Sequence, residues 1–135
     1  MTIRRRGDHR LQILGLARAE SEIDPGDLGR APGIDPGRFA APALPAASLL
    51  GMLQIDPAAD HVTVESGDGH YRASIPLEEV RRGGWLLLGQ PEEQGGPLRL
   101  VVEQGRTLCW NVKGVAVLRF TAGPEPDSVP ENPEH

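Results

Sequence analysis

The sequence is poor in cysteine, lysine and aromatic residues. Cys109 is the single cysteine among 135 residues, which excludes an intramolecular disulfide framework and fits a reducing compartment. We therefore predict a cytoplasmic protein. Aromatic residues make up 4% of the chain, so aliphatic side chains must supply most of the core. Lys113 is the only lysine, and all other fixed positive side-chain charge is arginine.

The sequence also lacks the features of membrane proteins, of secreted proteins and of nucleic-acid-binding proteins. No apolar run approaches the ~20 residues that a membrane-spanning helix needs. The arginine-rich start, MTIRRRGDHR, is not followed by the apolar segment of a signal peptide. A net charge of −5 with few stacking aromatics argues against nucleic-acid binding. We predict no membrane and no nucleic-acid partner, and we leave open a protein partner, a homo-oligomer or an anionic small molecule.

Turn-forming residues are abundant instead. The 17 glycines and 13 prolines favour short elements joined by turns, and 135 residues suit one domain. We expect a flexible N-terminal arm over residues 1–10 and a folded domain over residues 11–121. Residues 122–135 are rich in proline, with four carboxylates and no Lys or Arg, so we expect a disordered acidic tail.

The hydrophobic pattern predicts an α+β domain with a mixed β-sheet and a few short helices. Residues 45–56 indicate the best helix, with proline in its first turn and Asp56-Pro57 after it. Residues 61–75 are typical of a β-hairpin around a Gly-Asp-Gly turn, and PLEEVRRGG follows as a short helix. We expect residues 17–45 to be poorly structured, apart from a short helical turn that starts at Pro25–Leu28. Alternation predicts further strands in RLQILGL, WLLLGQ, PLRLVV and NVKGVAVLRFT.

Most polar residues of interest have an ordinary structural explanation. Cys109 has no neighbouring base or helix start, so we expect an inert, half-buried thiol. Asp68 and His70 support a weak hypothesis of an enzyme acting on an anionic substrate, but Asp-Gly is common turn chemistry. We assign no catalytic residue. We also predict no metal site, because none of the histidines has metal-ligand spacing: His9, His61, His70 and His135.

Arg99 and Lys113 are the main candidates for ligand binding. Each lies near the start of a predicted strand, beside a glycine-containing turn whose amides can bind an anion. The forked guanidinium of arginine and the point charge of lysine suit a phosphate or pyrophosphate. The alternative is that both are exposed strand charges that discourage edge pairing. The residues alone leave both interpretations open.

These two cations also carry a family resemblance. GGPLRLVV followed by NVKGVAVLRF resembles the closing segment of the sulfite-oxidase-like molybdopterin-binding domain, with Gly95, Pro97, Arg99 and Lys113 at the matching positions. Earlier segments resemble the family's opening strand, its helix and its hairpin, in the same order over residues 11–121: LQILGLA, LPAASLLGML and HVTVESGDGHYRASIPLEEV.

The resemblance implies the α+β fold of that family and a molybdopterin-type cofactor whose phosphate Arg99 and Lys113 would contact. A pocket for such a ligand would have Asn111 or Ser66 nearby, and we take Asn111 as the third cofactor-binding candidate. It also exposes differences. The family's molybdenum ligand is a cysteine between the opening strand and the helix, and residues 22–43 contain none. Gln94 stands where the family often has histidine, and Gly114 where it often has tryptophan. Whether the chain is an enzyme therefore stays open.

Two functions remain in view. The first is a small stand-alone domain that binds a molybdopterin-type or other anionic ligand without the family's cysteine ligand. The second is a non-catalytic relic scaffold that acts through protein–protein contacts. The apolar segment FAAPALPAA, residues 39–47, is the docking surface expected for the second function.

Overall fold

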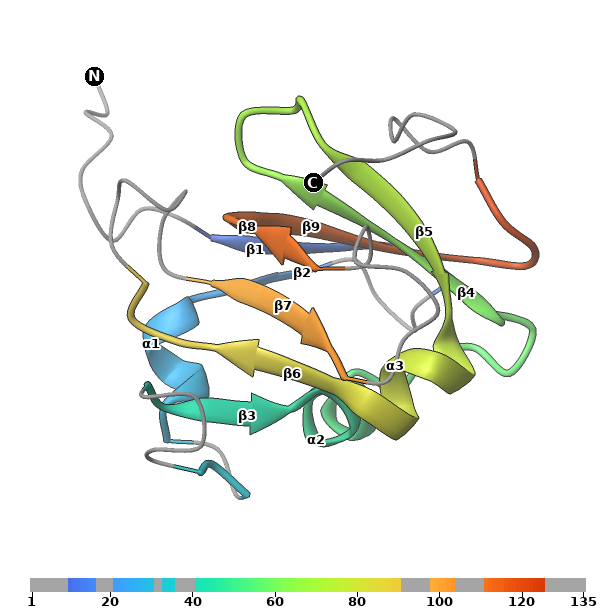
Figure 1. Ribbon diagram of the computed structural model, residues 1–135. Helices are drawn as coiled ribbons and strands as arrows, with labels where there is room; N and C mark the ends of the chain where they lie inside the picture. Colours follow the sequence, from blue (N-terminus) through green and yellow to red (C-terminus); the bar gives the residue numbers. More distant parts are fainter. Residues whose placement is uncertain are drawn as a thin grey trace.

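Two β-sheets face each other in the computed structural model, with short helices at the side (Figure 1). The structure describes residues 10–16, 21–30, 33–35, 41–90, 98–103 and 111–125. The prediction of an α+β domain with a few short helices is confirmed for these residues. The prediction of one mixed sheet is incomplete, because the strands divide between two sheets.

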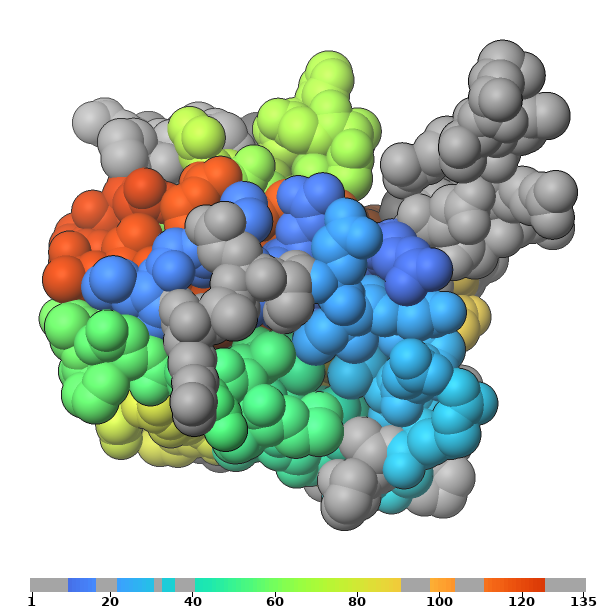
Figure 2. All heavy atoms as spheres, turned by 180° about the vertical axis from the view of Figure 1, so that it is seen from behind, coloured from blue at the N-terminus to red at the C-terminus, as the bar shows by residue number. Residues whose placement is uncertain are grey.

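The larger sheet has five strands in the order β2-β1-β9-β4-β5. Its strands β1 and β9 run parallel, and its other neighbours run antiparallel, so this sheet is mixed as predicted. Strands β1 and β9 lie side by side although they come from opposite ends of the chain (Figure 2). The strand bounds are β1 Leu11–Gly15, β2 Ser21–Ile23, β4 His61–Ser66, β5 Arg72–Pro76 and β9 Val115–Thr121.

The smaller sheet has four antiparallel strands in the order β3-β6-β7-β8. Its strand β3 lies inside the region over residues 17–45 that the sequence pattern left without regular structure, and it pairs with β6. The expectation of a poorly structured region is therefore wrong for β3 and for β2, because both strands gain their hydrogen bonds from partners outside the region. The helical turn predicted at Pro25 is confirmed as α1, Pro25–Leu28. The bounds are β3 Ala43–Pro45, β6 Gly84–Leu87, β7 Arg99–Val102 and β8 Val112–Lys113.

Gly114 divides the last predicted strand between the two sheets. The alternation predicted one strand over residues 111–121, but β8 belongs to the smaller sheet and β9 to the larger. Gly114 has φ +63, a conformation that glycine adopts without steric cost. Its carbonyl accepts a 2.8 Å hydrogen bond from Gly67 N–H, and Val115 N–H donates to Leu98 O at 3.0 Å. The chain thus turns a corner that links the two layers.

Three short helices occur within the described residues: α1 Pro25–Leu28, α2 Ala46–Met52 and α3 Leu77–Gly83. Asp24 caps α1 by accepting a hydrogen bond from Gly26 N–H at 2.9 Å. Prolines directly precede α2 and α3, as their fixed φ suits a helix start. Helices α2 and α3 lie next to each other beside the smaller sheet (Figure 1). No helix in the described part of the chain is long and apolar enough to span a membrane.

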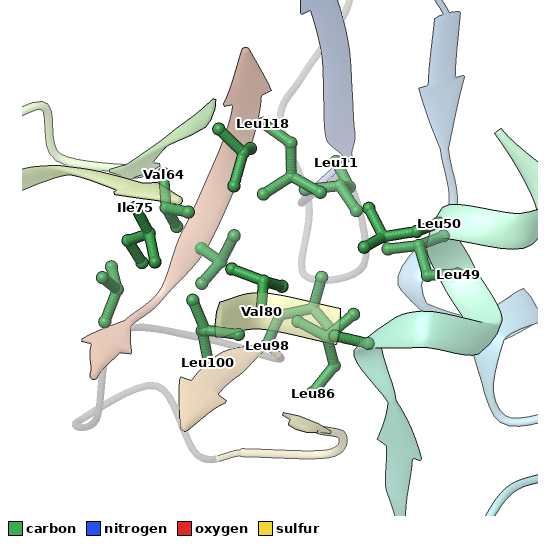
Figure 3. Close-up of a cluster of buried hydrophobic side chains, with 14 of the residues drawn as sticks. Leu11, Leu49, Leu50, Val64, Ile75, Val80, Leu86, Leu98, Leu100 and Leu118 are labelled. Atoms are coloured by element: carbon green, nitrogen blue, oxygen red, sulfur yellow. The ribbon is translucent and has the colours of Figure 1, made fainter. Parts of the chain in front are cut away.

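The core fills the space between the two sheets. Side chains of the larger sheet point toward those of the smaller sheet and of the helices (Figure 3). Period-two alternation explains this, because every second residue of a strand faces the same layer. The buried cluster is almost entirely aliphatic, as the composition predicts, and Phe120 is its one fully buried aromatic side chain among the described residues. Labelled members in Figure 3 include Leu11, Val64, Ile75, Leu118, Leu86, Leu100, Leu49 and Leu50.

Candidate functional site

Arg99 and Lys113 lie directly opposite each other on neighbouring strands. The antiparallel register of β7 and β8 pairs Arg99 with Lys113 and Leu100 with Val112. Leu100 and Val112 are buried, so the two cations share the outer face of the smaller sheet. Opposed residues have Cβ atoms about 4.5–5.5 Å apart, and like charges at that distance destabilise a sheet. The fold therefore concentrates positive charge at one point.

Arg99 has an unsatisfied donor at this point. Its Nε is buried and has no hydrogen-bond partner among the described residues. A buried donor that loses water without gaining a partner costs about 1–3 kcal/mol. Lys113, by contrast, is exposed. A bound anion would accept from Arg99 and neutralise both charges.

The rest of this outer face is apolar and aromatic. Leu87 on β6 is opposite Arg99, and the next outward pair along these strands is Trp85 and Val101. Trp85 is half-buried, and its Nε1 donates a 3.0 Å hydrogen bond to Glu103 Oε1. The indole is thereby held on the same face as the cations. Sequence reasoning missed Trp85, because its place beside Arg99 depends on the β6–β7 register.

Asn111 directly precedes β8 in the smaller sheet, and its side-chain oxygen already has a hydrogen-bond partner. Its Oδ1 accepts a 2.9 Å hydrogen bond from Val102 N–H, at the end of β7. This bond ties the chain that enters β8 to the neighbouring strand. Within the described residues the Asn111 side chain bonds through Oδ1 alone, and its predicted role in ligand binding stays a prediction.

The hairpin turn explains Asp68 and His70 without catalysis. Asp68 Oδ1 accepts hydrogen bonds from the Ser66 hydroxyl at 2.6 Å and from His70 N–H at 2.8 Å. These two bonds, that from Ser66 first, hold the pKa of the Asp68 carboxyl below its ordinary value. Both residues are exposed. The arrangement is that of a turn, and Ser66 is engaged within it.

His61 and His70 lie at opposite ends of the hairpin. His61 pairs in register with Pro76, whereas His70 is in the turn. The His61 Nδ1 is 2.8 Å from Asp60 Oδ1. Within the described ranges, no group of three or more His, Cys, Asp or Glu side chains is arranged to hold a metal ion. Cys109, Gln94, His9 and His135 lie outside the described residues.

The described part of the segment FAAPALPAA, residues 41–47, is largely built into the fold. It forms β3 and the start of α2. Ala43 and Leu44 are fully buried and Ala46 is 3% exposed. Ala43 and Leu44 are covered because β3 pairs with β6, so these two residues offer no exposed apolar surface. A role of the segment in protein contacts stays a prediction.

Comparisons with known proteins identify a fold. No family model matches the sequence, and no curated protein matches it. Among solved structures, the chain is similar to the sulfane dehydrogenase SoxCD from Paracoccus pantotrophus, with a TM-score of 0.71 and 21% sequence identity. The match covers 91% of this chain and 40% of that chain, so this chain spans less than half of its neighbour's length. At this identity the likeness concerns the fold alone.

Proposed function

We propose that this domain binds a phosphate-bearing ligand of the molybdopterin type at the outer face of the smaller sheet. The observation that carries the proposal is the direct opposition of Arg99 and Lys113, with Arg99 Nε buried and unpaired among the described residues. The fold likeness to a sulfane dehydrogenase and the sequence resemblance to a sulfite-oxidase-like domain support it, since both names denote redox proteins of sulfur compounds.

The phosphate end of such a ligand fits the residues of this face. Arg99 and Lys113 would hold the phosphate, with the amide nitrogen of Asn111 as a third contact. The half-buried Trp85 offers an apolar surface for the planar part of the ligand. When bound, a molybdopterin cofactor supplies oxygen-atom and electron transfer at its metal.

The metal end does not fit. A thiolate ligand sets the charge and electronics of such a metal. The chain has no cysteine before Cys109, so the segment between β1 and α2 offers no thiolate. We therefore propose ligand binding without oxygen-atom transfer by this chain.

Lys113→Ala tests the proposal on protein produced in a host that makes the cofactor. Loss of one charge-assisted contact, about 1.5–3 kcal/mol, should reduce retained pterin about tenfold or more, measured as oxidised-pterin fluorescence per mole of protein. The ligand-free variant should be slightly more stable, by about 0.2–1 kcal/mol, because the opposed charges are gone. Arg81→Ala is the matched control, since Arg81 is an exposed cation on α3.

Molybdenum content, measured on the same samples, separates the outcomes. Pterin without molybdenum supports binding without the metal site. Stoichiometric pterin and molybdenum would contradict the argument from the missing cysteine. A folded wild-type protein that contains neither pterin nor molybdenum would contradict ligand binding. The non-catalytic relic scaffold, which the missing thiolate favours, would then be the better explanation.

A further inference from the structure

The outer face of the larger sheet, on the far side of the core from Arg99, carries a row of polar side chains. Thr63 on β4 is paired in register with Arg119 on β9 and with Ser74 on β5. Its neighbours Val62 and Val64 are buried in the core, so Thr63 faces outward. Nevertheless Thr63 is 0% exposed. Something must therefore cover it from the outside.

Glu125 lies over this row. After β9 the chain turns back along the larger sheet (Figure 1). The Thr63 hydroxyl donates to Glu125 Oε1 at 2.8 Å, and Arg119 Nη1 is 3.4 Å from the same oxygen. Glu125 N–H donates to Ser74 Oγ at 3.0 Å. One residue thus uses its carboxylate and its backbone amide on three strands.

The residues before Glu125 are held in the same way. Gly123 N–H donates to Asp60 Oδ1 at 2.7 Å, and Gly123 O accepts from the Thr121 hydroxyl at 2.7 Å. The sheet and the residue before it therefore bind two backbone amides of this segment, those of Gly123 and Glu125. The sheet thus holds this segment as a surface holds a bound peptide, with backbone bonds for affinity and a side-chain contact for selectivity.

The cation of the site is held in place without Glu125. Arg119 Nη1 is 2.8 Å from Glu65 Oε2, closer than it is to Glu125. Glu65 also comes from the sheet itself, next to Thr63 along β4. The guanidinium therefore keeps an ion-pair partner if Glu125 leaves. Glu125 keeps about a third of its side chain exposed (32%), so it can be replaced without opening the core.

We propose that Thr63, Ser74 and Arg119 form a carboxylate-recognition site for an acidic peptide, which residues Gly123–Glu125 fill in cis. The ligand class is a peptide with a glutamate two residues after a glycine. The glutamate carboxylate bonds Thr63 and Arg119, and its amide bonds Ser74. The site is separate from the Arg99–Lys113 face, so its failure and that of the ligand-binding proposal are distinguishable.

The test uses the full chain with Glu125→Ala and a fluorescent peptide of sequence TAGPEPDS, followed by fluorescence anisotropy. Removing the cis carboxylate should tighten peptide binding at least about tenfold relative to the wild-type chain, because the competitor is gone. The same peptide with glutamine at the fifth position should bind at least about tenfold more weakly. Glu78→Ala, which removes an exposed carboxylate on α3, should behave as the wild-type chain does.

Three results would overturn the proposal. Equal peptide binding by the wild-type chain and Glu125→Ala would show that Glu125 does not occupy the peptide's site. Equal binding of the glutamate and glutamine peptides would show that the carboxylate is not recognised. Loss of the folded circular-dichroism spectrum in both Glu125→Ala and the milder Glu125→Gln would make the segment a part of the fold and not a replaceable ligand.

Discussion

Asp60 joins the hairpin to the segment that follows β9. Its Oδ1 is 2.8 Å from His61 Nδ1 and accepts the Gly123 N–H at 2.7 Å. These bonds favour the charged carboxylate and hold the pKa of Asp60 below its ordinary value of 3.8, with the His61 bond as the larger cause. One exposed side chain thus makes the position of Gly123 dependent on pH.

We expect Gly123 to loosen in acid. A carboxyl whose pKa is lowered by folding stabilises the fold above its unfolded pKa, and that contribution is lost as the pH falls through the lowered pKa. The protection of the Gly123 amide, measured by hydrogen exchange and corrected for intrinsic rates, should fall as the pH drops from the ordinary carboxyl value of 3.8 through the lowered pKa of Asp60. Asp60→Asn should flatten this dependence, and an unchanged profile in Asp60→Asn would contradict it.

The pKa of Asp68 is also lowered, but Asp68 does not contact Gly123 and so does not affect the exchange of the Gly123 amide. Its partners are Ser66 and His70, in the turn at the other end of the hairpin from His61. The His70 amide therefore reports on Asp68, and the Gly123 amide reports on Asp60.

The turn at Gly114 places β8 in the smaller sheet and β9 in the larger sheet. Strand β8 is only two residues long, and β9 begins directly after the glycine. The positive φ of Gly114 lets Lys113 stay opposite Arg99 while Val115 starts the next layer. A residue that resists this conformation would disturb the candidate site and the sheet junction together.

Gly114→Ala should lower the free energy of unfolding by about 1–2 kcal/mol, because a Cβ is disfavoured in the left-handed region. Gly51→Ala is the matched control in helix α2, where an added Cβ meets nothing within 4 Å. That control should raise the free energy of unfolding by about 0.5–1 kcal/mol, since alanine is the better helix former. Urea unfolding measures both, and equal effects would contradict the role assigned to the corner.

The two sheets are stable only together, because each buries its apolar face against the other. Phe120 on β9 is fully buried among side chains of the core cluster. Domains of this kind are stable by about 5–15 kcal/mol in total, so one large cavity is a substantial fraction of the total. The bound segment at Glu125 and the cation pair at Arg99 both depend on this shared core, since it holds their strands in register.

Phe120→Ala should lower the free energy of unfolding by about 3–5 kcal/mol through lost burial and an unfilled cavity. Met52→Ala is the control, because Met52 is 50% exposed at the end of α2. Its effect should stay within about 0.5 kcal/mol. Thermal or urea unfolding gives both values. A small effect of Phe120→Ala would contradict the claim that the stability of each sheet depends on its packing against the other.

Local patterns in the sequence were sufficient for the single elements. Period-two alternation, proline at helix starts and a Gly-Asp-Gly turn predicted α2, α3 and the β4–β5 hairpin, because these signals act between near neighbours. Alternation along PLRLVV also puts Arg99 and Val101 on one face of the strand and Leu100 on the other, and the structure agrees. Residues 1–9 of the arm predicted over 1–10, and residues 126–135 of the tail predicted over 122–135, lie outside the described residues. Gly123 and Glu125, at the start of that tail, make the hydrogen bonds given above.

Pairings between distant segments came from the folded structure. The second sheet, the parallel pairing of β1 with β9, the opposition of Arg99 and Lys113, and the contact of Glu125 with Thr63 all join residues far apart in the chain. Composition predicted an aliphatic core but not which strands share it. The physical reason is that alternation sets only which face a side chain takes, whereas its neighbours across the sheet depend on strand order and register, which the packing of the entire core selects.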